Sequence, residues 1–578
     1  MSDGKVLRRS ASYTPPVSGT RTTVIASAAA FAVLIGVPFL TRLGSERHET
    51  DGRRLIVVTP HVQQIQDEFA RGFSDWHERE FSEPVYIDYR IPGGTSEIRR
   101  QLEAEFKARL ADGTFSVERT DDRVEVVMPA GTIGADLMFG GGSYDHGTLA
   151  AGVQATVTTP DGEQLDLRVP MAIPAGLSQV ELDAIFGENR IGTQTLYEPD
   201  QYWIGTALSS FGIISNNDIL ERLDVPTPQA FRDLTDPRLF GWVALADPRQ
   251  SGSITTTFDS ILGNYGWDEG WSILREMCGN ARYFTAQSTK PPSDVSAGDA
   301  AVGLAIDFYG RGQAQTVAEA GDPDRVTYID PAGEVYIDAD PITILRGGPD
   351  PELARRFLRF VLSEEGQALW QFNAVTREAG AENPGGPGGT PMGPHRSELR
   401  RMPIRRSMYA KYFEYFKDPV VPFELVSDVE NPGWRTGVQM MMGAFGIDSA
   451  PKCRAAWGAI IESSDDPGFP PEVLAEMRDR FHAFPYTAVR SEVEGSESVE
   501  EWIPFTEATY RTVRNQWRDP VREARLRIRY TGFFIDRYNE IIEMARTRAV
   551  VPIPADPMAT GTADTDQTAS APVEATAP

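Results

Sequence analysis

The chain has 578 residues, of which 41% are hydrophobic and 24% are charged, as in ordinary soluble globular proteins. That length exceeds what one hydrophobic core usually serves, so we expect two or more lobes. A formal net charge of −27 argues against nucleic acid as a partner, because phosphate binding needs a basic surface.

An uncharged apolar stretch at 22–40 follows a polar leader with basic residues at 1–21. Its length matches the roughly 20 residues that cross a bilayer. The stretch is long for a signal peptide, shows no clean cleavage site and has no nearby cysteine for a lipid. We therefore expect an uncleaved transmembrane anchor, with a cleaved signal peptide as the alternative. Basic residues flank both ends, so their charge does not decide the orientation.

After a linker at 41–53, short apolar strands alternate with amphipathic helices, as expected for α/β units around a mainly parallel sheet. Residues 154–170 alternate polar and β-branched side chains, which predicts a β excursion from that sheet. A long strand pattern at 202–215 opens a second α/β series. The other expected strands are 55–58, 85–91, 136–139, 241–246, 301–306, 335–337 and 342–345, and the expected helices include 62–81, 96–110 and 351–372.

The last third of the chain has a different composition. Residues 379–399 are rich in Gly and Pro and predict a loop. Residues 400–550 are rich in Arg, Glu and aromatic side chains and predict a helical extension. The tail at 551–578 consists largely of Pro, Ala, Thr and Asp without periodicity, which predicts disorder.

The sequence carries none of the common enzyme motifs for serine nucleophiles, zinc proteases, phosphate loops or paired cysteines. Its six histidines are scattered without metal-ligand spacing. We therefore expect no catalytic residues, no metal site, no cofactor and no enzymatic activity. The two cysteines, Cys278 and Cys453, either form a disulfide or remain buried thiols.

A small polar cluster follows several expected strands, just before a helix start. Ligands of open parallel sheets bind beyond the carboxyl ends of the strands, where free N–H groups and helix dipoles favour anions. Glycine lets the backbone approach a ligand, and hydroxyl groups supply short donors. The alternative is a structural role, as helix caps or as tight turns. The cluster residues are Thr59 and His61; Gly94, Thr95 and Ser96; Gly141, Gly142 and Ser143; Ser251, Gly252 and Ser253; and Ser288 and Thr289.

Six segments carry a family resemblance. They are 207–216, 234–249, 251–253, 266–271, 295–303 and 363–370. In this order they resemble the extracellular solute-binding proteins of ABC importers, and within these the group that binds ferric iron, phosphorylated sugars and similar anions. The resemblance covers roughly residues 53–375.

The resemblance implies an α/β, two-lobed, periplasmic-binding-protein-like (type II) clamp, with the transmembrane helix before it and the helical extension after it. Residues 202–215 and 335–345 would be hinge strands that let the lobes close on a ligand. The implied lobes are 54–205 and 206–325, and 326–378 returns to the first lobe.

The resemblance also adds Ser209, Ser210, Asp307 and Tyr309 to the candidate ligand contacts. For Asp307 and Tyr309 the alternative is packing at a strand end. Iron-binding relatives tend to use paired tyrosines, whereas Phe308 precedes Tyr309 here. A phosphate, phosphonate, sulfonate or carboxylate group therefore fits better than a ferric ion.

The expected function is the substrate-binding component of an ABC transporter. It would capture a small anionic solute or metal complex on the periplasmic or extracellular face of the cytoplasmic membrane. Its partners would be that ligand, an ABC permease and the membrane. The alternatives are a membrane-tethered ligand sensor that signals through the extension, with Arg400 and Arg401 in a docking surface, and a hydrolase on a two-lobed scaffold.

Overall fold

The computed structural model describes residues 52–119, 124–159, 161–430, 432–491, 499–553 and 556–561. The expected anchor at 22–40 and most of the tail after 551 lie outside these residues. Within the described ranges, no helix has the length and apolar character needed to span a membrane.

Lobe 1 is built on a six-stranded sheet with the order β15-β8-β14-β5-β1-β2. β1, β2 and β5 run parallel, and β14 runs antiparallel to both β5 and β8. The last four residues of β1, at 55–58, are buried and all apolar, as expected where both faces of a sheet are covered, whereas the strand begins with Arg53 and Arg54. The strands are β1 (Arg53–Val58), β2 (Val85–Arg90), β5 (Leu137–Phe139), β8 (Ile204–Ser209), β14 (Asp338–Ile344) and β15 (Met402–Pro403).

The helices of lobe 1 follow its parallel strands. α2 (Gln63–Phe81), α3 (Thr95–Ala111) and α4 (Ser143–Ala151) come directly after β1, β2 and β5. The expected helix 351–372 is two helices, because Ser363 caps the second through its side chain, which accepts a hydrogen bond from Gly366 N at 3.0 Å. The remaining helices are α5 (Gln179–Phe186), α11 (Pro351–Leu362), α12 (Glu364–Gln371) and α13 (Arg406–Tyr412).

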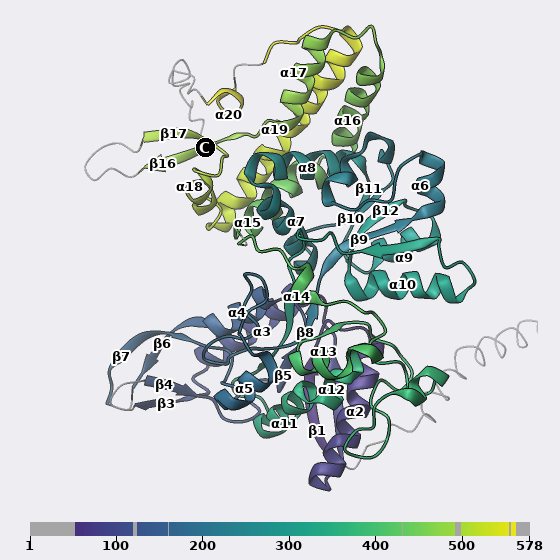
Figure 1. The fold of residues 1–578 in the computed structure, drawn as a ribbon. Helices are drawn as coiled ribbons and strands as arrows, with labels where there is room; N and C mark the ends of the chain where they lie inside the picture. Colours follow the sequence, from purple (N-terminus) through teal and green to yellow (C-terminus); the bar gives the residue numbers. More distant parts are fainter. Residues whose placement is uncertain are drawn as a thin grey trace, which may run out of the picture.

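Two hairpins project from lobe 1 (Figure 1). One pairs β6 (Val153–Thr158) with β7 (Gln164–Val169), where the alternating sequence pattern predicts a β excursion. The other pairs β3 (Ser116–Arg119) with β4 (Val124–Val127).

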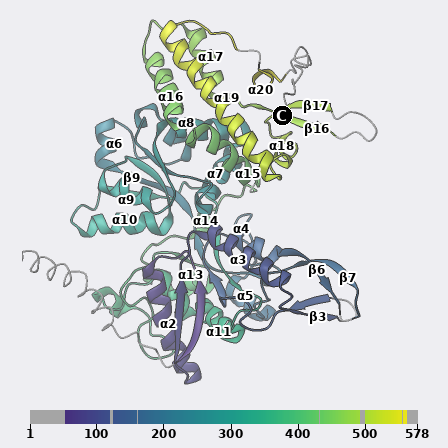
Figure 2. The same ribbon diagram turned by 180° about the vertical axis from the view of Figure 1, so that it is seen from behind.

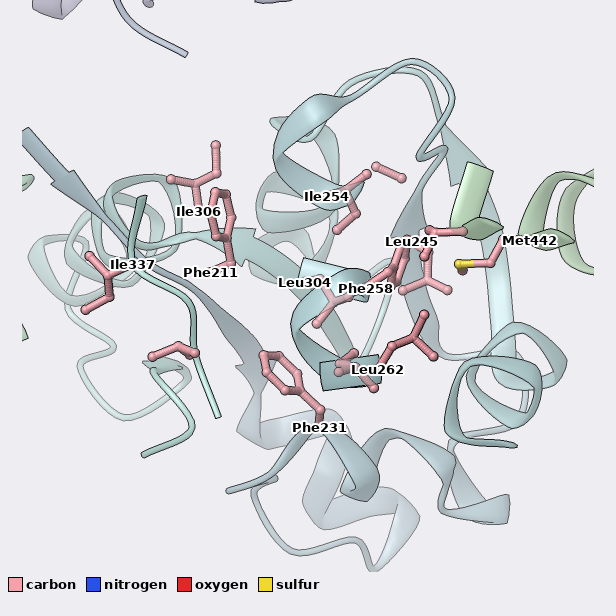
Figure 3. Close-up of a cluster of buried hydrophobic side chains, with 14 of the residues drawn as sticks. Phe211, Phe231, Leu245, Ile254, Phe258, Leu262, Leu304, Ile306, Ile337 and Met442 are labelled. Atoms are coloured by element: carbon pink, nitrogen blue, oxygen red, sulfur yellow. The ribbon is translucent and has the colours of Figure 1, made fainter. Parts of the chain in front are cut away.

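Lobe 2 contains a five-stranded sheet with the order β11-β10-β12-β9-β13. β10, β11 and β12 are parallel, and β9 runs antiparallel to β12 and β13. Figure 3 shows Phe211, Leu245, Phe258 and Leu304 in the apolar cluster of this lobe. The elements are β9 (Phe211–Asn216), α6 (Asn217–Leu223), β10 (Val243–Ala246), α7 (Gly252–Tyr265), α8 (Trp267–Asn280), β11 (Ala281–Thr285), α9 (Lys290–Ala297), β12 (Val302–Ile306), α10 (Asp307–Glu319) and β13 (Val326–Ile329).

The chain passes between the lobes at three places. Ser210 alone separates β8 of the first sheet from β9 of the second, so the strand pattern at 202–215 is two strands that meet at the lobe boundary. The chain returns between β13 and β14. It crosses again beside the hinge, where Val426 pairs with Val335 and Ser427 N donates to Val335 O at 2.9 Å.

The extension differs from the wholly helical segment expected at 400–550. β15 adds an edge strand to the sheet of lobe 1, and β16 pairs with β17 in a hairpin. Of the helices after residue 434, those at 435–442, 450–465 and 471–482 pack on α7 and α8 of lobe 2, and the long helix at 520–547 packs on the last two (Figures 1 and 2). The elements are α14 (Pro422–Leu425), α15 (Arg435–Met442), α16 (Ala450–Asp465), α17 (Pro471–His482), β16 (Tyr486–Ser491), β17 (Val499–Pro504), α18 (Tyr510–Asn515), α19 (Pro520–Thr547) and α20 (Pro557–Thr560).

Lobe 2 and the extension share a core. Met442 of α15 joins the apolar cluster in Figure 3. Arg275 of α8 is fully buried and donates to the carbonyls of Phe481 and Ala483. Cys278 and Cys453 are both buried, free thiols, and burial raises the pKa of each. Lobe 2 and the helices on it therefore form one packed unit.

Candidate functional site

A cleft of about 760 Å³ lies between the two lobes. The carboxyl ends of β1, β2 and β5 reach it from lobe 1, and those of β10, β11 and β12 reach it from lobe 2. A helix begins after each of these six strands. Since the first N–H groups of a helix have no partner within the helix, this arrangement directs polar donors from both lobes toward one space.

The helix starts around the cleft are not all capped. α2, α3 and α9 begin after Val62, Gly94 and Thr289 without a side-chain cap. α7 is capped by Ser251, whose Oγ accepts from Ile254 N at 3.4 Å. At the start of α4, Ser143 N donates to the carboxylate of Asp338 at 3.0 Å. The uncapped starts of α2 and α3 are those best able to bind an anion, whereas α9 carries Pro291 and Pro292, which lack an N–H, in its first turn.

Most of the residues that the sequence predicts as ligand contacts line this cleft. The structure brings together His61, Gly94, Thr95, Gly141, Gly142, Ser209, Ser251, Gly252, Ser253, Ser288, Thr289 and Tyr309. They come from strand ends that lie far apart in the sequence and meet only in the fold.

The other five predicted residues lie behind the lining and make internal contacts. Thr59 donates to Phe139 O at 2.7 Å and joins two strand ends. Ser210 donates to Asp330 at 2.6 Å at the lobe boundary. The remaining contacts are those of Ser96 with Asp145, Ser143 with Asp338, and buried Asp307 with Arg311.

The glycines of the loop after β5 are required by packing. Gly140 and Gly141 have φ values of 91° and 106°, which favour glycine. A Cβ on Gly140 would lie 2.2 Å from His61 Nε2, and one on Gly141 would lie 2.3 Å from Thr95 Cγ2. The loop therefore fits closely around two side chains of the cleft.

A buried charged group forms one wall of the cleft. Asp340 accepts from Gly141 N at 2.7 Å, lies 2.7 Å from His61 Nε2 and pairs with Arg401. Burial disfavours the charged carboxylate, but Arg401 and His61 hold the pKa of Asp340 well below its usual range. Burial also lowers the pKa of His61, so its ring is neutral near pH 7. Its Nε2 then carries the proton toward Asp340, and Nδ1 is an acceptor.

Three buried polar atoms of the lining have no hydrogen-bond partner in the described part of the chain: His61 Nδ1, Ser209 Oγ and Arg401 Nε. Their residues are only 4%, 6% and 6% exposed. A buried polar atom without a partner costs about 1–3 kcal/mol. Their residues belong to the lining, so the walls of the cleft contain a charged donor, a hydroxyl and an acceptor.

Further charged and phenolic groups surround this centre. Arg100 and Arg249 line the cleft, and Arg249 Nη2 is held by Asp247 at 2.8 Å. Burial raises the pKa of Asp338 to about 6. Burial also raises the pKa of Tyr309 to about 12, so its phenol remains protonated at neutral pH.

Asp338, Asp340 and Arg401 are cleft residues that the sequence does not reveal. Asp338 and Asp340 lie on β14, within a strand rather than after one. Arg401 precedes β15, beyond the Gly/Pro-rich loop, in a segment that predicts a docking surface. No local pattern marks any of the three.

Residues 176–385 match the model of a protein family described as bacterial extracellular solute-binding protein. Over this segment the match confirms the resemblance to the solute-binding proteins of ABC importers. An uncharacterized protein of Haemophilus influenzae is 27% identical over 162 residues, which are 28% of this chain and 44% of that protein. The Phosphoglycerate transport regulatory protein PgtC of Salmonella typhimurium is 24% identical over 168 residues, 29% of this chain and 40% of that protein. The matched region thus spans less than half the length of these relatives.

Two solved periplasmic binding proteins are among the structures to which this chain is similar. The fructose-6-phosphate-bound AfuA of Actinobacillus pleuropneumoniae has a TM-score of 0.39 and 19% identity over 55% of this chain and 81% of that chain. The iron-bound HitA of Pseudomonas aeruginosa has a TM-score of 0.41 and 16% identity over 67% of this chain and 99% of that chain.

Proposed function

We propose that this chain is the substrate-binding component of an ABC importer. It captures a small anionic solute outside the cytoplasmic membrane, closes on it and delivers it to a permease. The observation that carries the proposal is the cleft, into which helix starts of both lobes converge. The family match over residues 176–385 supports the same role. Binding without covalent change needs no catalytic group.

The lining favours an anion that also carries hydroxyl groups. Helix starts and the Arg401 Nε donor suit a phosphate or carboxylate group. Ser209 Oγ and the His61 Nδ1 acceptor suit hydroxyl groups of the same molecule. The name of the relative PgtC, which refers to phosphoglycerate transport, supports this ligand class.

An organic anion fits this site better than a bare ferric ion. In the ranges that the structure describes, no group of three or more His, Cys, Asp or Glu side chains is placed to hold a metal. Tyr309 supplies one phenol to the cleft, and Asp340 is already paired with Arg401. The proposed role of 22–40 is to tether the clamp beside its permease, which raises the local concentration of the closed complex.

A thermal-shift screen of the full chain in detergent tests the proposal. The panel contains inorganic phosphate, sulfate, 3-phosphoglycerate, hexose 6-phosphates, ferric citrate and the unphosphorylated sugars. A ligand at 100 times its Kd stabilises the native state by about 2.7 kcal/mol. We expect stabilisation by phosphorylated hydroxy compounds and none by the free sugars. Equal stabilisation by uncharged sugars, or by no compound of the panel, would contradict the proposed ligand class.

A further inference from the structure

A side chain of the C-terminal extension, that of Arg435, lies beside cleft residues of lobe 2 and beside lobe 1. Arg435, the first residue of α15, donates to Thr256 Oγ1 at 2.6 Å and to Gly252 O at 3.0 Å, both in α7 of lobe 2. Its guanidinium carbon also lies 4.8 Å from the ring centroid of Tyr144 in α4 of lobe 1. Arg435 therefore contacts both lobes at once.

This contact lies where the lobes touch. A Cβ on Gly252 of lobe 2 would be 3.3 Å from Asp145 Oδ2 of lobe 1 and 3.8 Å from Arg435 Nη2. A Cβ on Gly94 of lobe 1 would be 3.8 Å from Gln250 O of lobe 2. The lobes are thus nearly in van der Waals contact on this side of the cleft.

Arg435 is hydrogen-bonded to lobe 2, whereas it reaches lobe 1 through the ring of Tyr144 and through electrostatic attraction to Asp338. The preceding residue, Trp434, donates its N–H to Asp259 Oδ1 of α7 at 3.0 Å. The Trp434 ring lies 4.9 Å from that of Trp267 in lobe 2, measured between centroids. The partner on lobe 1, Tyr144, is 57% exposed. A hinge motion that opens the cleft must therefore separate Tyr144 from Arg435.

We propose that Arg435 is a latch through which the C-terminal extension holds the two lobes closed. The inference rests on the proposed function, in which closure retains the solute. Because the helices at 435–547 and lobe 2 form one packed unit, the latch moves with lobe 2 and engages lobe 1 only in the closed arrangement. A cation over an aromatic ring at a partly exposed site corresponds to about a two- to fivefold change in an equilibrium constant.

Distances between the lobes report the closed-to-open ratio in the absence of ligand, and so test the latch directly. Two cysteines are introduced into the full chain by Val180→Cys in α5 of lobe 1 and Glu221→Cys in α6 of lobe 2, and both are spin-labelled. Both positions are exposed, whereas native Cys278 and Cys453 are buried. We expect a population at short distance in the otherwise unchanged protein. Arg435→Ala and Tyr144→Leu should each lower the closed-to-open ratio about two- to fivefold.

Three further variants separate a latch from a loss of folding. Tyr144→Phe keeps the ring and should behave as the unchanged protein. Arg454→Ala removes a comparable arginine contact of the extension, in which Arg454 donates to Arg282 O of lobe 2 at 2.6 Å, and should leave the lobe distances unchanged. The double variant Arg435→Ala/Tyr144→Leu should match Arg435→Ala, because that single variant already removes the contact with Tyr144.

Additive effects in the double variant, an equal effect of Arg454→Ala, or no short-distance population at all would overturn the latch. The test remains distinct from that of the proposed function. A ligand screen without hits, together with lobe distances that respond to Arg435→Ala, would contradict the proposed ligand class and support the latch. Ligand binding together with unchanged lobe distances in Arg435→Ala would support the proposed function and overturn the latch.

Discussion

Arg401 and Asp340 form a buried ion pair in the wall of the cleft, although α11 and α12 lie between them in the sequence. Arg401 also lies over the ring of Phe308 in lobe 2, with its guanidinium carbon 4.4 Å from the centroid. One cation thus neutralises a carboxylate of lobe 1 and packs on an aromatic ring of lobe 2. The following predictions start from this pair.

Replacement of Arg401 by Met should weaken both the ligand complex and the fold. Removing one partner of a buried ion pair leaves an uncompensated charge and costs about 3–5 kcal/mol. Denaturant unfolding measures this loss, and calorimetry should show at least a tenfold weaker ligand complex. The double variant Arg401→Met/Asp340→Asn should recover much of the stability but not the affinity. Unchanged affinity in Arg401→Met would show that the ligand does not use this cation.

Asp338 should make stability depend on pH. Burial raises its folded pKa to about 6, above the value of about 3.9 in an unfolded chain. The stability that Asp338 contributes to the folded state is therefore fully present below about pH 4, and it is lost as the pH rises through about 6. Asp338→Asn should be more stable than the unchanged protein at pH 8, by about 1–2 kcal/mol because Asp338 is partly exposed, and the difference should vanish near pH 4. Denaturant unfolding at both pH values gives the two differences, and a constant difference would contradict the assignment.

Ser251 and Ser253 provide a matched pair that separates capping from ligand contact. Ser251 caps α7, so Ser251→Ala should lower the free energy of unfolding by about 1 kcal/mol. Ser253 lines the cleft one residue inside the helix, so Ser253→Ala should leave the Tm of the empty protein unchanged and weaken ligand binding severalfold. A lower Tm with unaltered affinity in Ser253→Ala would assign this serine to packing.

Tyr309 should remain a neutral phenol in the ligand complex. Its pKa of about 12 and the absence of a second cleft tyrosine at position 308 disfavour a ferric tyrosinate. Ferric citrate added to the protein should therefore produce no visible tyrosinate-to-iron absorption, and Tyr309→Phe should weaken binding of an organic anion only a fewfold. Such an absorption band, lost in Tyr309→Phe, would instead assign a ferric ion to the cleft.

The sequence predicts much of the cleft because the signals are local. Each cluster of Gly, Ser or Thr follows an apolar strand and precedes a helix, and parallel strands bring such junctions to one edge of a sheet. Asp340 and Arg401 lack such signals, because antiparallel β14 and edge strand β15 bring them into the cleft. The hairpin of β16 and β17 is short and lies between helices, so a prediction that rests on the composition of the whole segment 400–550 misses it.

Residues 426–430 run beside the hinge strands, where Tyr336 donates its hydroxyl to Glu430 O at 3.0 Å. A third connection restricts the ways in which the lobes can turn or twist relative to each other. The open state then has fewer relative orientations of the two lobes. Closure on a solute, as proposed, therefore loses less conformational entropy. Under the proposed function, part of the affinity for the solute therefore comes from the path of the backbone, through residues that do not line the cleft.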